Sequence, residues 1–144
     1  MEAYTRKVQY YETDKMGITH HSNYIRWMEE ARIDFLERLG LGYKKLEAAG
    51  IVSPVVSVAC EYKAPTTFDD TVTITVEVEQ FRGVKLALRY TVTKVPDGTT
   101  VMLGRSSHCF LDPEGRPFAL KKRFPELDAV LKDLAAAAEG IALS

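Results

Sequence analysis

The sequence predicts an α+β fold in which one antiparallel sheet packs on one long helix. Two patterns predict this fold. From about residue 22, apolar side chains recur at steps of three and four, which places them on one face of a helix. Between about residues 56 and 111, apolar and polar side chains alternate in several segments, which is typical of strands with one buried face. We expect the sheet to curve around the helix, because both elements must bury an apolar face.

The first predicted elements are a short strand and the long helix. Val8–Tyr11 is predicted to form the strand, and residues 12–17 are predicted to turn. The helix is expected from Ser22 to about Leu39, with Ser22 or Asn23 as its N-cap. Its apolar stripe comprises Tyr24, Ile25, Met28, Ala31, Phe35, Leu36 and Leu39.

A short helix and four strands are predicted to follow. The helix is expected at residues 43–49, because Gly50 can end it. The strands are expected near residues 56–62, 71–79, 84–93 and 100–111. In the second and third of these strands, valine, isoleucine and leucine point one way, whereas most charged side chains and threonines point the other. The polar face of the sheet is a predicted oligomer surface, because a single helix leaves it uncovered.

The length of 144 residues fits one domain, 1–144, since domains of about 100–150 residues are the commonest. A chain of this length buries enough surface to fold without disulfides or a structural metal. Residues 124–139 are predicted to form a C-terminal helical extension, in which Pro125 can start the helix. The apolar stripe of this helix comprises Leu127, Val130, Leu131 and Leu134.

The composition argues against several classes of protein. Hydrophobic residues make up 46% and charged residues 27% of the chain, which is typical of a globular protein and argues against disorder. The formal net charge of −1 argues against a dedicated nucleic-acid binder. No apolar run approaches the ~20 residues that span a bilayer, and the first residues lack the apolar segment of a secretory signal. We therefore expect a cytoplasmic protein without membrane association, in which Cys60 and Cys109 are reduced.

The candidate chemistry lies between the first strand and the long helix. Asp14, Gly17, His20 and His21 precede a helix N-terminus, whose free backbone N–H groups attract negative charge. A carbonyl oxygen aimed at this N-terminus would be stabilised as it becomes an oxyanion. Asp14 could then act as a nucleophile or as a base for water. His21 could orient the carbonyl group, the water or Asp14.

The same residues also have a simpler interpretation. An aspartate after a strand is commonly a turn residue, and histidines before a helix are commonly caps or surface residues. No metal site is expected, because adjacent histidines do not share a helix face and no cysteine or carboxylate has a recognisable metal-ligand spacing. The chain also contains no P-loop, no dinucleotide-binding fingerprint and no nucleophile-elbow motif.

Two stretches of sequence carry motifs of a known family. The first contains Tyr11-Glu12-Thr13-Asp14, Gly17, His21-Ser22-Asn23-Tyr24 and Glu30-Ala31-Arg32. The second runs from Glu61-Tyr62-Lys63-Ala64-Pro65 to Asp69-Asp70. In these motifs the chain resembles the hotdog-fold acyl-CoA thioesterases, and within them the branch of 4-hydroxybenzoyl-CoA thioesterase. With the strand pattern, the resemblance covers about residues 4–112.

The resemblance implies both an architecture and an activity. It implies a sheet wrapped around the long helix, and a homodimer or homotetramer with active sites between subunits. It implies hydrolysis of the thioester of an acyl-coenzyme A to the free acid and coenzyme A, with no cofactor besides the coenzyme A of the substrate. Asp14 matches the catalytic aspartate, and the backbone N–H of His21 matches the group that polarises the thioester carbonyl. The His21 side chain matches a histidine of the acyl-CoA branch.

Further residues are expected to contact the substrate. Gly17 matches a glycine that lets the loop approach the thioester. Arg82 and Lys85 are candidates for binding the phosphates of coenzyme A. The acyl pocket is expected to be lined by Met16, Ile18, Tyr24 and Trp27, although Trp27 and Met28 are also predicted as core or interface residues.

Two other functions stay open. The same fold hosts hydratases and dehydratases of acyl thioesters, in which the aspartate and the histidine lie closer together in sequence. His20 and His21 follow Asp14 by six and seven positions, which favours the thioesterase. The second alternative is a non-catalytic acyl-CoA-binding protein.

Overall fold

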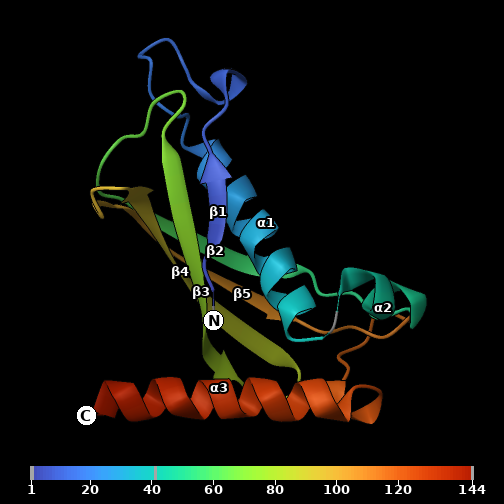
Figure 1. The fold of residues 1–144 in the computed structure, drawn as a ribbon. Helices are drawn as coiled ribbons and strands as arrows, with labels where there is room; N and C mark the ends of the chain where they lie inside the picture. Colours follow the sequence, from blue (N-terminus) through green and yellow to red (C-terminus); the bar gives the residue numbers. More distant parts are fainter. Residues whose placement is uncertain (1, 41, 144) are drawn as a thin grey trace.

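The structure, a computed structural model, describes residues 2–40 and 42–143. Its strands form one antiparallel five-stranded sheet with the order β1-β3-β4-β5-β2 (Figure 1). The elements are β1 (Tyr4–Lys7), α1 (Ser22–Arg38), α2 (Tyr43–Ala48), β2 (Val55–Tyr62), β3 (Thr71–Phe81), β4 (Lys85–Val95), β5 (Thr100–Cys109) and α3 (Pro125–Leu143). The predicted α+β fold, with one sheet packed on one long helix, is confirmed.

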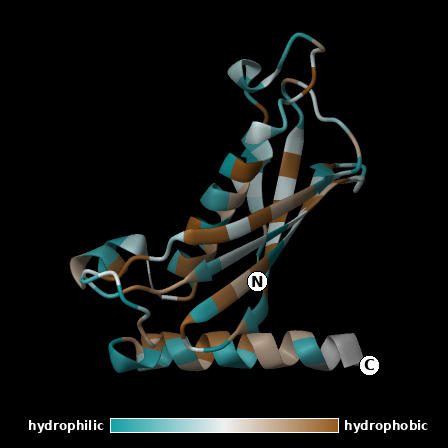
Figure 2. Ribbon diagram, turned by 180° about the vertical axis from the view of Figure 1, so that it is seen from behind, coloured by the Kyte–Doolittle hydropathy of each residue, from teal (hydrophilic) through white to brown (hydrophobic). Residues whose placement is uncertain are grey.

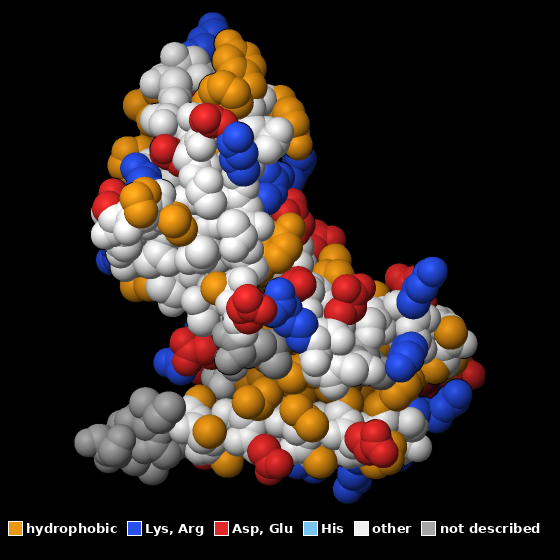
Figure 3. All heavy atoms as spheres, in the orientation of Figure 1, with side chains coloured by type: hydrophobic (Ala, Val, Ile, Leu, Met, Phe, Trp, Pro, Cys, Tyr) orange, Lys and Arg blue, Asp and Glu red, His pale blue; other side chains and the backbone are white. Residues whose placement is uncertain are grey.

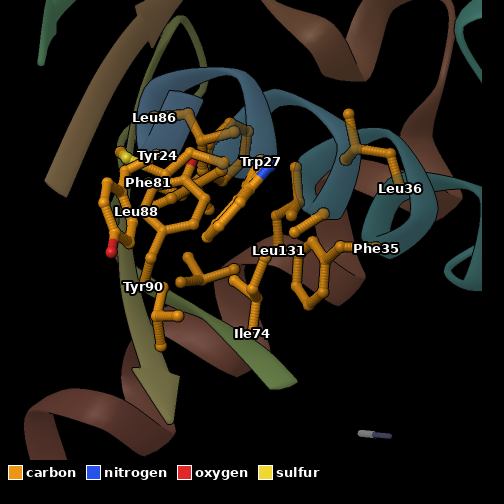
Figure 4. Packing of buried hydrophobic residues seen from close by; sticks show 14 of the residues in the cluster. Tyr24, Trp27, Phe35, Leu36, Ile74, Phe81, Leu86, Leu88, Tyr90 and Leu131 are labelled. Carbon is orange, nitrogen blue, oxygen red and sulfur yellow. The ribbon is translucent and has the colours of Figure 1, made fainter. Parts of the chain in front are cut away.

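The long helix α1 supplies most of the helical side of the core. The predicted stripe is buried at Tyr24, Met28, Ala31, Phe35 and Leu36, and Trp27 joins it as a fully buried core residue. Figure 4 shows that these side chains converge with residues of β3, β4 and α3. The prediction was wrong for Ile25, which is 42% exposed, because its position lies beside the buried stripe and faces solvent.

The strands β3 and β4 supply the opposite side of the core. In β3, Ile74 and Val78 are buried and Val76 is half-buried, and the β4 residues paired with these three are buried. Figure 2 shows the resulting alternation of hydrophobic and hydrophilic residues along the strands. The edge strand β2 departs from this pattern, because its valines lie exposed at the end of the sheet.

The helix α3 closes the end of the core where β3 terminates (Figure 1). Leu127, Leu131 and Ala135 of this helix are buried in the common hydrophobic cluster. Val130, which was predicted on the same stripe, is 37% exposed. No helix in the described part of the chain is both long enough and apolar enough to cross a bilayer.

Several predicted boundaries were wrong, among them the end of the C-terminal helix, which runs to Leu143 rather than to residue 139. The first strand is Tyr4–Lys7, and residues 10–12 form a 3₁₀ turn, because the Glu12 side chain turns back to accept the N–H of Gln9 at 2.8 Å. Strand β5 ends at Cys109, before the predicted residue 111.

The N-cap of α1 is His21, whereas Ser22 or Asn23 was expected. Both predicted side chains bond elsewhere. The Ser22 hydroxyl pairs with His20 Nδ1 at 2.8 Å, and the Asn23 amide donates to the main-chain oxygen of Glu12 at 2.8 Å. The start of the helix is therefore held by contacts to the preceding loop.

Candidate active site

Asp14 begins the turn of a short hairpin that precedes α1. Its N–H donates to the Ile18 oxygen at 2.9 Å, and the N–H of Gly17 donates to the Asp14 oxygen at 2.9 Å. The carboxylate takes part as well, since Oδ1 accepts the N–H of Met16 at 2.8 Å. Gly17 has a φ of +79°, a conformation that favours glycine, so the turn itself explains this residue. The carboxylate is fixed through Oδ1, whereas no described residue bonds Oδ2.

The hairpin is tied to the loop before β3. Ile18 forms a bridge with Thr67, and the N–H of Thr19 donates to the Thr66 oxygen at 2.8 Å. The Thr19 and Thr66 hydroxyls are 2.6 Å apart, and the Tyr24 hydroxyl lies 2.9 Å from the Thr66 hydroxyl. These groups are buried. The second arm of the hairpin, residues 18–20, is therefore held between residues 12–14 and residues 66–67.

The second arm leads directly into α1. The N–H groups on either side of His21 are bonded, because His20 donates to the Glu12 oxygen at 2.9 Å and Ser22 donates to His20 Nδ1 at 3.2 Å. The N–H of His21 has no acceptor among the described residues. It lies at the positive end of a 17-residue helix, where an unpaired N–H group favours negative charge.

Asp14 and His21 line the same hollow, which has a volume of about 470 Å³. Tyr24 also lines it, as do Met16 and Ile18. The full lining comprises Asp14, Met16, Ile18, Thr19, His21, Tyr24, Tyr62, Lys63, Ala64 and Pro65. Trp27, expected in this pocket, is instead fully buried and donates its indole N–H to Glu12 at 2.8 Å.

Arg82 and Lys85 are not brought to this hollow within one chain. They flank the turn after β3, whereas the Asp14 hairpin is bound to the segment before β3. The 11 residues of β3 span roughly 35 Å at about 3.3 Å per residue. Binding of coenzyme A phosphates by Arg82 and Lys85 therefore stays a prediction.

Tyr62 is a site residue that the sequence did not reveal. It comes from the end of β2 and donates its hydroxyl to the His21 oxygen at 3.2 Å. Its ring also lies near those of His21 and Tyr24, with centroids 6.2 and 5.4 Å away. Partial burial, with a further contribution from the Cys60 thiol, raises the pKa of Tyr62 to about 12, so it remains a hydrogen-bond donor at neutral pH.

Hydrophobic side chains gather near this site at one tip of the molecule (Figure 3). The exposed members are Tyr10, Tyr11, Met16 and Phe68, and the rings of Tyr10 and Phe68 meet edge to face at 5.6 Å. In the described ranges, 2–40 and 42–143, no three or more histidine, cysteine or acidic side chains are grouped to hold a metal ion. The site therefore offers a carboxylate, a free amide and apolar walls.

The hotdog fold is an antiparallel sheet with this strand order that packs against one long helix. The N-terminus of that helix lies beside the loop that precedes it. The sequence agrees with this assignment. It matches the family described as the thioesterase-like superfamily over residues 8–136, and the chain belongs to that family.

Individual relatives point the same way. The chain is 36% identical over 121 residues to a putative acyl-CoA thioesterase, YneP, of Bacillus subtilis, covering 83% of this chain and 87% of that one. It is 36% identical over 130 residues to a putative esterase of Aquifex aeolicus, covering 90% and 97%. Among solved structures, a DHNA-CoA thioesterase of Staphylococcus aureus superposes with a TM-score of 0.88 at 29% identity, covering 96% of this chain and 93% of that one.

Proposed function

We propose that this protein hydrolyses acyl-coenzyme A thioesters to the free acid and coenzyme A. The observation that carries the proposal is that the Asp14 carboxylate and the unpaired His21 N–H line one hollow. The names of the relatives support the substrate class, since YneP and the staphylococcal protein are both described as acting on CoA thioesters.

In the proposed reaction, the thioester oxygen accepts the His21 N–H. The helix N-terminus then stabilises the negative charge that develops on this oxygen, and one such donor is worth roughly 2.7–4 kcal/mol of barrier. The thiolate of coenzyme A leaves readily, because a thiol of this kind has a pKa of about 8.5. The site therefore needs no strong general acid.

Asp14 has two possible parts in this reaction. As a nucleophile, its free Oδ2 attacks the acyl carbon, the C–S bond breaks, and water then hydrolyses the resulting anhydride. As a general base, Asp14 takes a proton from a water molecule that attacks the same carbon. Single turnover in ¹⁸O-labelled water tests the nucleophilic role, because ¹⁸O enters the enzyme only when water attacks the Asp14 carbonyl of the anhydride.

The test of the activity is thiol release from a panel of acyl-coenzyme A substrates. We expect at least one substrate to release free thiol, and Asp14→Asn to abolish most of that release. A hydratase or dehydratase would change double-bond absorbance without releasing thiol. Binding of acyl-coenzyme A without turnover would identify an acyl-CoA-binding protein instead, and either result would remove the hydrolase proposal.

We also propose that two or more copies assemble through β2. This strand lies at the edge of the sheet, and Val55, Val56 and Val58 are exposed along it. An apolar edge strand of eight residues invites pairing with another strand. Arg82 and Lys85 would then contact the substrate from a second copy. Sedimentation analysis of the protein and of Val58→Lys tests this assembly, and a wild-type monomer would refute it.

A further inference from the structure

One buried hydrogen bond joins the Asp14 hairpin to the first turn of α1. The main-chain oxygen of Glu12 accepts two bonds, from the His20 N–H at 2.9 Å and from the Asn23 side-chain amide at 2.8 Å. The first bond belongs to the hairpin itself. The second joins the two parts of the site, because Glu12 lies two residues before Asp14 and Asn23 lies two residues after His21.

The acceptor of this bond is itself held rigidly. The Glu12 side chain is buried at 2% exposure, and its carboxylate accepts the Trp27 indole at 2.8 Å and the Gln9 N–H at 2.8 Å. Arg6 adds two bonds to the same carboxylate, at 3.0 and 3.1 Å, and also bonds Glu30 on α1 at 2.9 Å. Glu12 is thus fixed to β1 and α1 before the Asp14 turn begins.

Asn23 has no other evident reason to occupy its position. Asparagine is a weak helix former and is favoured at caps, yet the cap of α1 is His21. The Asn23 side chain is buried. Among the described residues, its side chain forms a hydrogen bond to the main-chain oxygen of Glu12. A buried amide without this partner would be unsatisfied, which destabilises the folded state.

We propose that Asn23 is a positioning residue for the thioester hydrolysis. Its bond to the Glu12 oxygen sets the separation between the Asp14 carboxylate and the His21 N–H, which must reach the same acyl group. This inference rests on the proposed function. A misplacement of about 1 Å between reacting groups costs roughly 10²-fold in rate, so loss of this bond reduces kcat more than it changes substrate binding.

The test compares Asn23→Ala and Asn23→Asp with Tyr90→Phe. Asn23→Asp keeps the shape of the side chain but places a second acceptor against the Glu12 oxygen. Tyr90→Phe removes a buried hydroxyl, which contacts Ser106 at 2.6 Å and Arg32 at 3.3 Å, from a part of the sheet that does not line the hollow. It provides a comparable loss of stability without touching the site.

We expect both Asn23 variants to lose about 10²-fold in kcat with KM little changed, and Asn23→Asp to be no better than Asn23→Ala. Tyr90→Phe should keep the wild-type kcat. A purely structural role predicts that any loss of kcat in the Asn23 variants only follows their loss of stability and is matched by Tyr90→Phe. That result overturns the proposal. A wild-type kcat in either Asn23 variant also overturns it, provided that the variant is folded and unfolds cooperatively.

Asp14→Asn is assayed alongside these variants to separate the two levels of the argument. If Asp14→Asn is inactive and the Asn23 variants turn over normally, the positioning role fails and the proposed function stands. If Asp14→Asn turns over at the wild-type rate, the proposed chemistry fails, and the role of Asn23 fails with it.

Discussion

Two hairpins in this chain have the same local structure in different surroundings. In both, the N–H of an aspartate donates to the carbonyl oxygen four residues later, at 2.9 Å for Asp14 and 2.8 Å for Asp112. In both, the aspartate Oδ1 accepts the N–H two residues later, at 2.8 and 3.0 Å. The glycines that complete the turns, Gly17 and Gly115, both have a φ of +79°.

The two hairpins lead into different structures. Both hairpins first pair back, His20 with Glu12 at 2.9 Å and Phe118 with Phe110 at 2.8 Å. The arm after Asp14 then enters α1 and presents the unpaired His21 N–H, whereas the arm after Asp112 leads into the 3₁₀ turn Leu120–Lys122. An aspartate in such a turn is therefore explained by the turn alone. Any chemistry at Asp14 must come from the helix N-terminus against which its hairpin is held.

The largest difference in activity between the two hairpins is expected when the charge of each aspartate is removed. Asparagine retains the Oδ1 acceptor, so Asp14→Asn and Asp112→Asn should both keep their turns and unfold within about 0.5 kcal/mol of the wild type. We expect Asp14→Asn to lower kcat by roughly 10³-fold or more, and Asp112→Asn to leave it unchanged. Thiol-release kinetics measure both, and equal losses in the two variants would show that the turns matter only structurally.

The next largest effect is expected two residues before each aspartate. This position is Glu12 in one hairpin and the buried Phe110 in the other. Glu12→Gln removes a buried carboxylate that pairs with Arg6 at 3.0 Å, which should cost about 3 kcal/mol in the free energy of unfolding. Phe110→Leu changes packing without changing charge and should cost about 1.5 kcal/mol or less. Urea unfolding measures both. If Glu12→Gln leaves the free energy of unfolding unchanged, the ion pair does not hold the hairpin.

A pH-dependent effect is expected from His108, which lies four residues before Asp112. His108, on β5, is buried beside Arg32 and bonds Ser106 at 2.7 Å, and no described residue bonds its Nδ1. Burial, reinforced by the positive charge of Arg32, lowers the pKa of His108 to about 4.

The sign is set by the unfolded chain, in which the pKa of a histidine is about 6.5. The unfolded state binds a proton below pH 6.5, whereas the folded state does so only near pH 4. Stability from His108 is thus complete above pH 6.5 and falls by about 2.5 kcal/mol by pH 4.5. His108→Gln should lose less stability than the wild type between pH 7 and 4.5 in urea unfolding, and equal losses would assign the effect to other groups.

Sequence patterns predicted the parts of the fold that burial alone determines. The buried stripe of α1 and the inward faces of β3 and β4 follow directly from the spacing of apolar residues. The apolar pattern failed where a tertiary contact determines the backbone conformation. Tyr10 and Tyr11 suit a strand, yet Glu12 turns back toward Gln9 because Arg6 and Trp27 hold its carboxylate.

The candidate site divides in the same way. Asp14, Gly17 and His21 lie within eight residues, so one motif brings them together. Tyr62 reaches His21 from 41 residues away, and its contact depends on where β2 ends in the sheet. Asn23 was recognised as a motif residue and expected as a cap, but its actual partner, Glu12, depends on how the hairpin folds back.

The smallest expected effect distinguishes the two glycines. Neither Gly17 nor Gly115 has any atom within 4 Å of an added Cβ, so alanine at either position meets no steric obstacle and is opposed only by the left-handed backbone. Each substitution should cost about 1 kcal/mol in the free energy of unfolding, with nearly equal values for the two.

Activity should separate these two alanine variants. Gly17→Ala should lower kcat/KM, because its turn carries Asp14 into the substrate hollow, whereas Gly115→Ala should not. Calorimetric unfolding and thiol-release kinetics on the same preparations provide both numbers. Equal stability with unequal activity would show that the same turn acquires a function from its position beside α1, and equal activity would place the substrate away from the Asp14 turn.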